Sequence, residues 1–214
     1  MEDLNAFAKQ CHDISESKGW TALKRTDTQL CNLMISECIE ALEDFRDNKA
    51  ISEIYYEVKY TTSDVDANNK HSKSMSRAEF LEFKKNEGSA YRIDSAKPCG
   101  IPIEIADFII RCGQFFGTNN LDLTQAVENG GGSDVESDFN EMLADVMQCI
   151  CLARLSSPEK GHEKDRGVMA NYLGEAFFIS VEFCERASLD IWSAVREKNE
   201  YNATRPHLHG GKKI

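Results

Sequence analysis

The sequence predicts an all-α protein, a helical bundle with a small irregular or β insert. Three observations support this fold class. Apolar residues recur at three- and four-residue steps over most of the chain, as they do on one face of a helix. The 214 residues include only four prolines, and runs in which apolar and polar residues alternate are few. Hydrophobic residues make up 41% of the chain, which is ordinary for a protein with a packed core.

Seven segments show apolar residues at helical spacing, and several begin or end at a recognisable signal. The first stops before Gly19, a helix breaker, and the third begins near Pro102, a residue suited to the first turn. Ser133 and Glu136 form a capping-box pattern at the start of the fifth. We expect helices over residues 4–17, 27–47, 102–117, 122–129, 133–155, 168–187 and 190–202.

The segment between the second and third helices differs from the rest of the chain. Residues 54–60 are predicted to form a short strand, whereas residues 64–76 are polar and expected to be mobile. Ser76 and Glu79 form another capping-box pattern, which predicts a short helix to about residue 87. A polar loop is expected over residues 156–166.

A triglycine at residues 130–132 separates two parts of the chain that resemble each other. The segment LDLTQAVEN at Leu121 parallels LDIWSAVRE at Leu189, and ISECIEAL at Ile35 aligns with LADVMQCI at Leu143. These matches indicate an internal duplication in which the second copy keeps the packing residues and loses most of the acidic ones.

We therefore predict two related helical halves packed as one compact unit. The first covers residues 1–129, is predicted to bind a metal and contains the insert at about residues 48–100. The second covers residues 130–214 and is a degenerate copy that ends in a basic tail.

Charge and composition exclude several classes of protein. A net charge of −11 argues against a broad surface for nucleic acid or for an anionic membrane, since both require basic patches. No apolar run reaches the roughly 18–20 residues of a membrane span, and the first 20 residues do not resemble a secretory signal. Most of the eight cysteines occupy apolar helical positions without zinc-site spacing, so we expect reduced thiols in a cytoplasmic protein.

Two acidic pairs stand out because each lies within an apolar helical pattern. Glu37 and Glu40 are three residues apart, as are Glu104 and Asp107, so each pair projects from one helix face. Two carboxylates about 4 Å apart repel by roughly 4 kcal/mol at an effective dielectric constant of about 20. Four of them need cations, and oxygen-only ligands favour Mg²⁺ or Mn²⁺.

Spacing alone does not decide the role of these acids. An E-x-x-E step is very common on solvated helices, where it has no function. A di-iron bundle is a further alternative, but it requires E-x-x-H on its helices. The single E-x-x-H string of this chain, from Glu159 to His162, lies in a predicted loop.

Four strings of the chain resemble the MazG-like, all-α nucleoside triphosphate pyrophosphohydrolases, relatives of the dimeric dUTPases. The strings are KGW at Lys18, SECIEALEDFR at Ser36, KPCGIPIEIADFIIR at Lys97 and KNEYNATRPHLHGGKK at Lys198. E-x-x-E followed by E-x-x-D is specific only in this setting, whereas the KP…GIP…E-x-x-D string and the YN-x-TRP…HGGK tail are more specific. The insert and residues 130–189 are poorly covered.

The resemblance implies a helical bundle, commonly oligomeric, that cleaves the α–β bond of a nucleoside triphosphate to give a monophosphate and pyrophosphate. It implies Glu37, Glu40, Glu104 and Asp107 as ligands of Mg²⁺, with Mn²⁺ as the alternative ion. One glutamate, Glu40 in preference to Glu37, would orient the attacking water.

The resemblance also implies a substrate-binding role for the tail. Lys198, Asn202 and Arg205 would contact the phosphates, as cations and an amide suited to phosphate oxygens. Without the motif, a solvated basic terminus is the default interpretation. Trp20 is a candidate for stacking on the base, although an indole after a helix-breaking glycine more often packs against the bundle.

The tail follows the acid-poor half, so the resemblance leaves open whether tail and acids meet within one chain or between the chains of a homodimer. The expected partner is a nucleoside triphosphate of unspecified base and sugar, with no nucleic acid and no membrane. Two alternatives from other classes remain. One is a non-catalytic nucleotide-sensing or interaction module, and the other is a purely structural helical protein.

Overall fold

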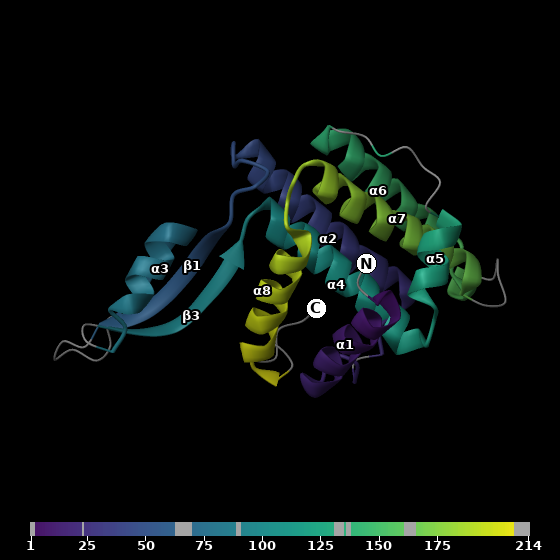
Figure 1. Ribbon diagram of the computed structural model, residues 1–214. Coiled ribbons are helices and arrows are strands. Elements are labelled where there is room, and N and C mark those ends of the chain that lie inside the picture. The colour runs from purple at the N-terminus through teal and green to yellow at the C-terminus, as the bar shows by residue number, and fades with distance from the viewer. Residues whose placement is uncertain are drawn as a thin grey trace.

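The computed structural model describes residues 3–22, 24–62, 70–88, 91–130, 135, 138–160 and 166–207. These residues form a mainly helical protein in which a small antiparallel sheet and one short helix project from one end of a helical bundle (Figure 1). The predicted combination of a helical bundle with a β insert is therefore present. Within this part of the chain, no helix combines the length and apolar character that crossing a membrane requires.

Helix α4 (Ile101–Asn119) lies at the centre of the bundle. Fourteen of its 19 residues are buried, including two acidic ones, as expected for a helix that is covered on all sides. It contacts α1 (Leu4–Ser17), α2 (Asp27–Arg46) and α8 (Ile191–Thr204), which belong to the two ends and the first third of the chain (Figure 1). Segments far apart in the sequence thus meet around one helix.

The remaining helices extend the same core. Helix α7 (Gly167–Arg186) packs against both α5 (Leu123–Gly130) and α6 (Phe139–Leu155), and α6 also contacts α2. A single cluster of buried apolar side chains runs through all of these helices, and a short 3₁₀ turn, Pro158–Lys160, follows α6. Whether the two halves are a duplication stays a prediction from the sequence.

The insert between α2 and α4 contains more strand than the sequence indicated. Strands β1 (Tyr55–Thr62), β2 (Lys70–Ser76) and β3 (Tyr91–Cys99) form an antiparallel sheet in the order β2-β1-β3. Helix α3 (Arg77–Lys85) packs on one face of the sheet and encloses a second apolar core of Tyr56, Val58, Met75 and Phe80.

The expectation that residues 64–76 are mobile is wrong for residues 70–76, which form β2; residues 63–69 lie outside the described part. Strand β2 has one buried residue among seven, so it lacks the alternating pattern that identifies a strand. Strand β3 was not predicted either, because its sequence is mostly polar and ends at Pro98 and Cys99, immediately before the helix signal.

The capping boxes predicted from the sequence mark the start of α3 but not the start of α6. Ser76 and Glu79 form the predicted capping box of α3. The predicted start of α6 near Ser133 is wrong, because the helix begins at Phe139, where the Asp138 side chain accepts hydrogen bonds from the backbone N–H groups of the first turn. Ser133 and Glu136 themselves lie outside the described residues.

Gly100 fixes the junction between the sheet and the central helix. Its backbone has φ of 114°, a conformation that disfavours other residues, and a Cβ atom there would collide with the backbone carbonyl oxygen of Glu53. The two ends of the insert, at Glu53 and at Gly100, therefore pack tightly against each other where α4 begins.

We expect Gly100→Ala to lower the free energy of unfolding by at least about 2 kcal/mol, since it combines positive-φ strain with a backbone collision. The matched control is Gly88→Ala, where φ is 88° and nothing lies within 4 Å of the added Cβ. Urea denaturation should show the smaller loss for Gly88→Ala. Equal losses in the two variants would contradict the collision.

Candidate functional site

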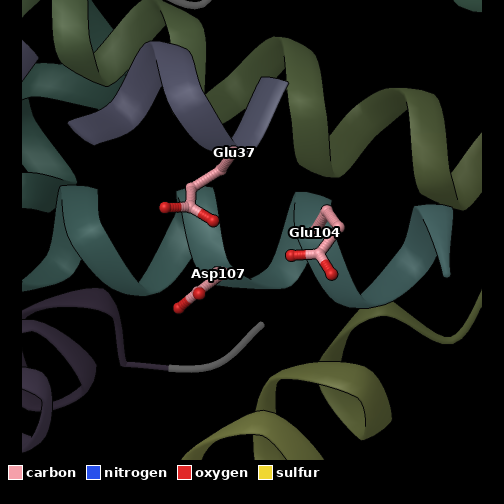
Figure 2. A group of neighbouring side chains, drawn as sticks. All are labelled: Glu37, Glu104 and Asp107. Carbon is pink, nitrogen blue, oxygen red and sulfur yellow. The ribbon is translucent and has the colours of Figure 1, made fainter. Parts of the chain in front are cut away.

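Three of the four predicted acids lie together between α2 and α4. Glu37 on α2 faces Glu104 and Asp107 on α4, and each provides a carboxylate oxygen within 4.8 Å of the other two (Figure 2). All three side chains belong to the buried interior of the protein. We refer to Glu37, Glu104 and Asp107 as the acidic triad.

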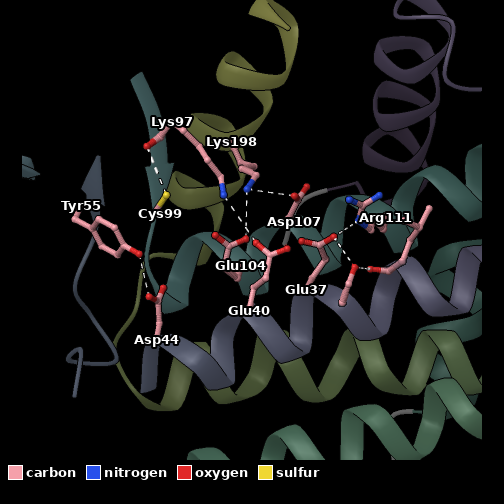
Figure 3. A network of polar contacts seen from close by, with 12 residues as sticks. Glu37, Glu40, Asp44, Tyr55, Lys97, Cys99, Glu104, Asp107, Arg111 and Lys198 are labelled. Atoms are coloured by element: carbon pink, nitrogen blue, oxygen red, sulfur yellow. Dashed lines mark hydrogen bonds and ion pairs between the residues drawn. The ribbon is translucent and has the colours of Figure 1, made fainter. Parts of the chain in front are cut away.

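Glu40, the fourth predicted acid, lies one turn further along α2. It is not part of the acidic triad, and its side chain is 47% exposed. Its carboxylate lies 3.8 Å from the Nζ of Lys97, and it lines the same cleft as Glu37 and Asp107 (Figure 3). Its place at the rim of the site differs from the buried position of the triad.

Lys198 provides a buried counter-charge from the far end of the chain. Its Nζ lies 3.4 Å from an oxygen of Glu104 and 3.2 Å from an oxygen of Asp107 (Figure 3). The Lys198 side chain is only 3% exposed. Helix α8 therefore brings Lys198 to Glu104 and Asp107 within one chain.

Arg111 is a second counter-charge, one that was not among the site residues predicted from the sequence. Its Nε donates a hydrogen bond of 2.6 Å to Glu37 (Figure 3). It stands four residues after Asp107 on α4, a spacing typical of an ion pair on one helix face. The four-residue spacing from Asp107 could have drawn attention to Arg111 in the sequence. In the structure, however, Arg111 donates its hydrogen bond to Glu37 on the neighbouring helix α2.

The three acids differ in their readiness to ionise. Burial, reinforced by the charge of Asp107, raises the pKa of Glu37 to about 7 against the opposing effect of Arg111. Burial also raises the pKa of Glu104 to about 7, although Lys198 opposes it. For Asp107 burial acts in the same direction, but Lys198 and Arg111 together outweigh it and lower the pKa of Asp107 to about 2.

This donor set fits a hard divalent cation. All ligand atoms are carboxylate oxygens, which suit Mg²⁺ and Mn²⁺, and neither histidine nor cysteine belongs to the cluster. The Lys198 ammonium gives one positive charge to two carboxylates, so the triad with Glu40 has capacity for further positive charge. Because two of the acids have pKa values near 7, a divalent cation at this site would compete with protons.

Glu37 and Asp107 of the triad, together with Glu40, open into a polar cleft of about 350 Å³ that is lined by residues of both charge signs. Its volume falls within the range of small-molecule sites. Besides the helices, strands β1 and β3 contribute to its walls, a contribution that the sequence did not indicate. The lining residues are Glu37, Glu40, Glu57, Lys59, Ser95, Lys97, Asp107, Arg111, Lys198, Tyr201 and Arg205.

The other predicted binding residues occupy three different environments. Arg205 lines the cleft, and its guanidinium carbon lies 5.7 Å from the centroid of the Trp20 ring. Trp20 itself lines a separate pocket beside Arg25, not the cleft. Asn202 is 3% exposed, and its side-chain oxygen accepts no hydrogen bond from the residues that the structure describes.

The N-terminal KGW string and the beginning of the tail string pack together. The Nζ of Lys18 donates a hydrogen bond of 2.6 Å to the backbone oxygen of Ala203, and a Cβ atom on Gly19 would collide with the ring of His207. The HGGKK end of the tail, from His209 onward, lies outside the described residues.

Comparisons of the chain with protein-family models, with curated proteins and with solved structures found no match. The resemblance to the MazG-like enzymes therefore stays a prediction from the four strings.

In metal-free buffer, we expect stability to fall as the pH rises from about 4.5 to about 7. The pKa values of Glu37 and Glu104 are about 7 in the folded protein and 4.5 when unperturbed. In this window the folded state therefore binds more protons than the unfolded state, and deprotonation favours unfolding. Melting temperatures measured with a chelator present would test this.

Glu37→Gln is the matched comparison, because an amide of the same shape does not titrate. Its melting temperature should depend less on pH over the same window than that of the natural protein. Identical pH dependence in the two proteins would refute the assignment of Glu37.

Proposed function

We propose that this chain is a Mg²⁺-dependent nucleoside triphosphate pyrophosphohydrolase that releases pyrophosphate and a nucleoside monophosphate. The observation that carries this proposal is the acidic triad beside Lys198 and Arg111, open to a cleft lined by further cations. The acidic residues and the basic residues of the cleft both need to be accounted for by its ligand.

A mixed set of charges fits a complex of a metal with phosphates. Acids alone would repel a polyphosphate, and a metal alone would not need the ammonium and guanidinium groups around it. A divalent cation between protein carboxylates and phosphate oxygens satisfies both sets, because Mg²⁺ is commonly held by one or two carboxylates together with substrate phosphates. The cleft thus favours a nucleotide polyphosphate over an uncharged ligand.

Glu37, Glu104 and Asp107 would hold the metal, and Glu40 at the rim is close enough along α2 to extend the set. When bound, Mg²⁺ supplies charge stabilisation on the phosphate oxygens and lowers the pKa of bound water. Mn²⁺ has the same ligand preference.

Different residues of the chain would bind the phosphates and accept the proton of the attacking water. Lys198, Arg111 and Arg205 bind phosphate oxygens and hold the α-phosphorus in place. Glu40 accepts a proton from the attacking water as the water oxygen bonds to phosphorus. The bond between that phosphorus and the bridging oxygen breaks, and the bridging oxygen leaves as part of pyrophosphate.

Two finer features belong to the same proposal. The helical core would be of the MazG-like type, which is supported by the way the four resembling strings converge: two provide the acids, and the other two pack against each other beside the cleft. A cytoplasmic location is supported by the eight cysteines, all of which are free thiols.

The homodimer remains a prediction from the resemblance.

A non-catalytic nucleotide sensor is the second candidate function. The contact of Lys198 with both Glu104 and Asp107 favours it, because this ammonium already neutralises part of the site without a metal. Tight nucleotide binding without pyrophosphate release, measured by calorimetry and by a release assay, would select this candidate.

We expect Glu37→Gln and Asp107→Asn each to reduce pyrophosphate release at least about a hundredfold, since each removes a charged ligand and keeps the side-chain shape. The assay should use purified protein, Mg²⁺ and a panel of ribo- and deoxyribonucleoside triphosphates. Glu43→Gln, an exposed acid on the same helix α2, is the matched control and should retain activity.

Two outcomes would contradict the proposal. If the natural protein releases no pyrophosphate from any nucleotide of the panel, the enzymatic function is wrong. If the triad variants keep full activity while the natural protein is active, the metal assignment is wrong. Circular dichroism of each variant separates lost activity from lost folding.

Besides binding phosphate, Lys198 is a counter-charge for Glu104 and Asp107, and Lys198→Met tests this structural role. We expect the metal-free variant to melt at a lower temperature, because Glu104 and Asp107 lose their ion pairs in the interior. Added Mg²⁺ should raise its melting temperature more than that of the natural protein, since no ammonium competes for the carboxylates. An equal Mg²⁺ effect in both proteins would oppose this prediction.

A further inference from the structure

The sheet of the insert has two chemically different faces. Tyr56 and Val58 of β1 pack with Phe80 in the apolar core under α3. The alternate residues of β1 point the other way, and Glu57 pairs with Lys97 of β3, while Lys59 pairs with Ser95. These four residues, Glu57, Lys59, Ser95 and Lys97, all line the cleft, and we call them the sheet wall.

The sheet wall is tied to the helix that reaches the acids. Glu197 of α8 accepts hydrogen bonds from the hydroxyl of Tyr56 and, at 2.8 Å, from the Nη2 of Arg77. Glu197 is the immediate neighbour of Lys198, which contacts Glu104 and Asp107. The wall therefore has a defined position relative to the acidic triad (Figure 3 shows Lys97 beside the acids).

The two sides of the cleft suit different parts of a nucleotide. The sheet wall presents no aromatic or apolar side chain, only two lysines, a carboxylate and a hydroxyl. Helix α8 contributes Tyr201, the one aromatic side chain among the described residues that line the cleft. Bases stack on aromatic rings, whereas phosphates require cations. The base thus fits the α8 side, and the phosphate chain runs towards the sheet.

Within the sheet wall, the two lysines have different surroundings. Lys97 lies 3.8 Å from Glu40 and stands opposite Glu57 in the strand register. Lys59 stands opposite the uncharged Ser95, and it forms no ion pair with any residue in the described ranges. It is two residues further from the acids along the sheet, about 7 Å. A lysine with no carboxylate opposite it at this outer position can take the last phosphate of a chain.

We propose that Lys59 binds the terminal phosphate of the substrate and makes the site select nucleoside triphosphates over diphosphates. This inference rests on the proposed function for the identity of the ligand. It assigns to the insert a part in substrate recognition, and it requires the phosphate chain to extend from the triad, past Lys97, to the outer end of the sheet wall.

The test compares kcat/KM for a nucleoside triphosphate with that for the matching diphosphate, both followed as monophosphate formed in the presence of Mg²⁺. Lys59→Ala should reduce the ratio of the two values about tenfold, because it removes one charge-assisted contact made only by the triphosphate. Lys59→Arg should retain most of the preference, since it keeps the charge.

Lys73→Ala is the matched control. Lys73 pairs with Val58 in the register of β1 and β2, so it lies on the sheet face opposite the cleft, and it is exposed. Its ratio should equal that of the natural protein. If Lys59→Ala leaves the ratio unchanged, or changes only the preference among bases, the inference is wrong.

A binding measurement separates this inference from the proposed function. Calorimetry with Mg²⁺ and with triphosphate and diphosphate analogues that have a methylene group in place of the α–β bridging oxygen requires no hydrolysis. If the natural protein does not turn over nucleotides but prefers the triphosphate analogue, and Lys59→Ala loses that preference, only the catalytic proposal fails. If neither analogue binds, both proposals are wrong.

Discussion

The structure depends on the burial of three carboxylates between two helices. Glu37, Glu104 and Asp107 lie close enough to repel one another strongly in a poorly solvated interior. Arg111 and Lys198 supply the opposing charge through direct contacts. Because a buried charge without a partner costs several kcal/mol, this arrangement requires α8 to pack against α4.

From these contacts a continuous path leads to the insert. Lys198 contacts the acids on α4, and its neighbour Glu197 binds Tyr56 and Arg77 of the insert. Gly100 joins the end of β3 to the first residue of α4 and packs against the backbone of Glu53, just before β1. The sheet is thus attached to the bundle at both the central helix and α8, and the position of the cleft wall follows from the same interactions that balance the acids.

The helices could be predicted from the sequence because their signal is local. Periodicity predicted seven of the α-helices among the described residues, and the capping box of Ser76 and Glu79 predicted α3; the errors lie at helix ends such as the start of α6. The two acidic pairs could be predicted too, because the members of each pair are three residues apart on one of these helices. The sheet wall of the cleft could not be predicted, because Lys59 and Ser95 are far apart in the sequence and come together only when β1 pairs with β3. Arg111 was overlooked since its partner, Glu37, belongs to another helix.

The long separation between Lys198 and the acids has a consequence for how the protein is made. Lys198 follows Glu104 by 94 positions in the sequence, so the acid-bearing helices leave the ribosome well before this counter-charge exists. If a nascent chain compacted before α8 was made, it would bury these acids without this partner, and that cost disfavours premature compaction. Completion of the native core is thereby coupled to synthesis of the last helix.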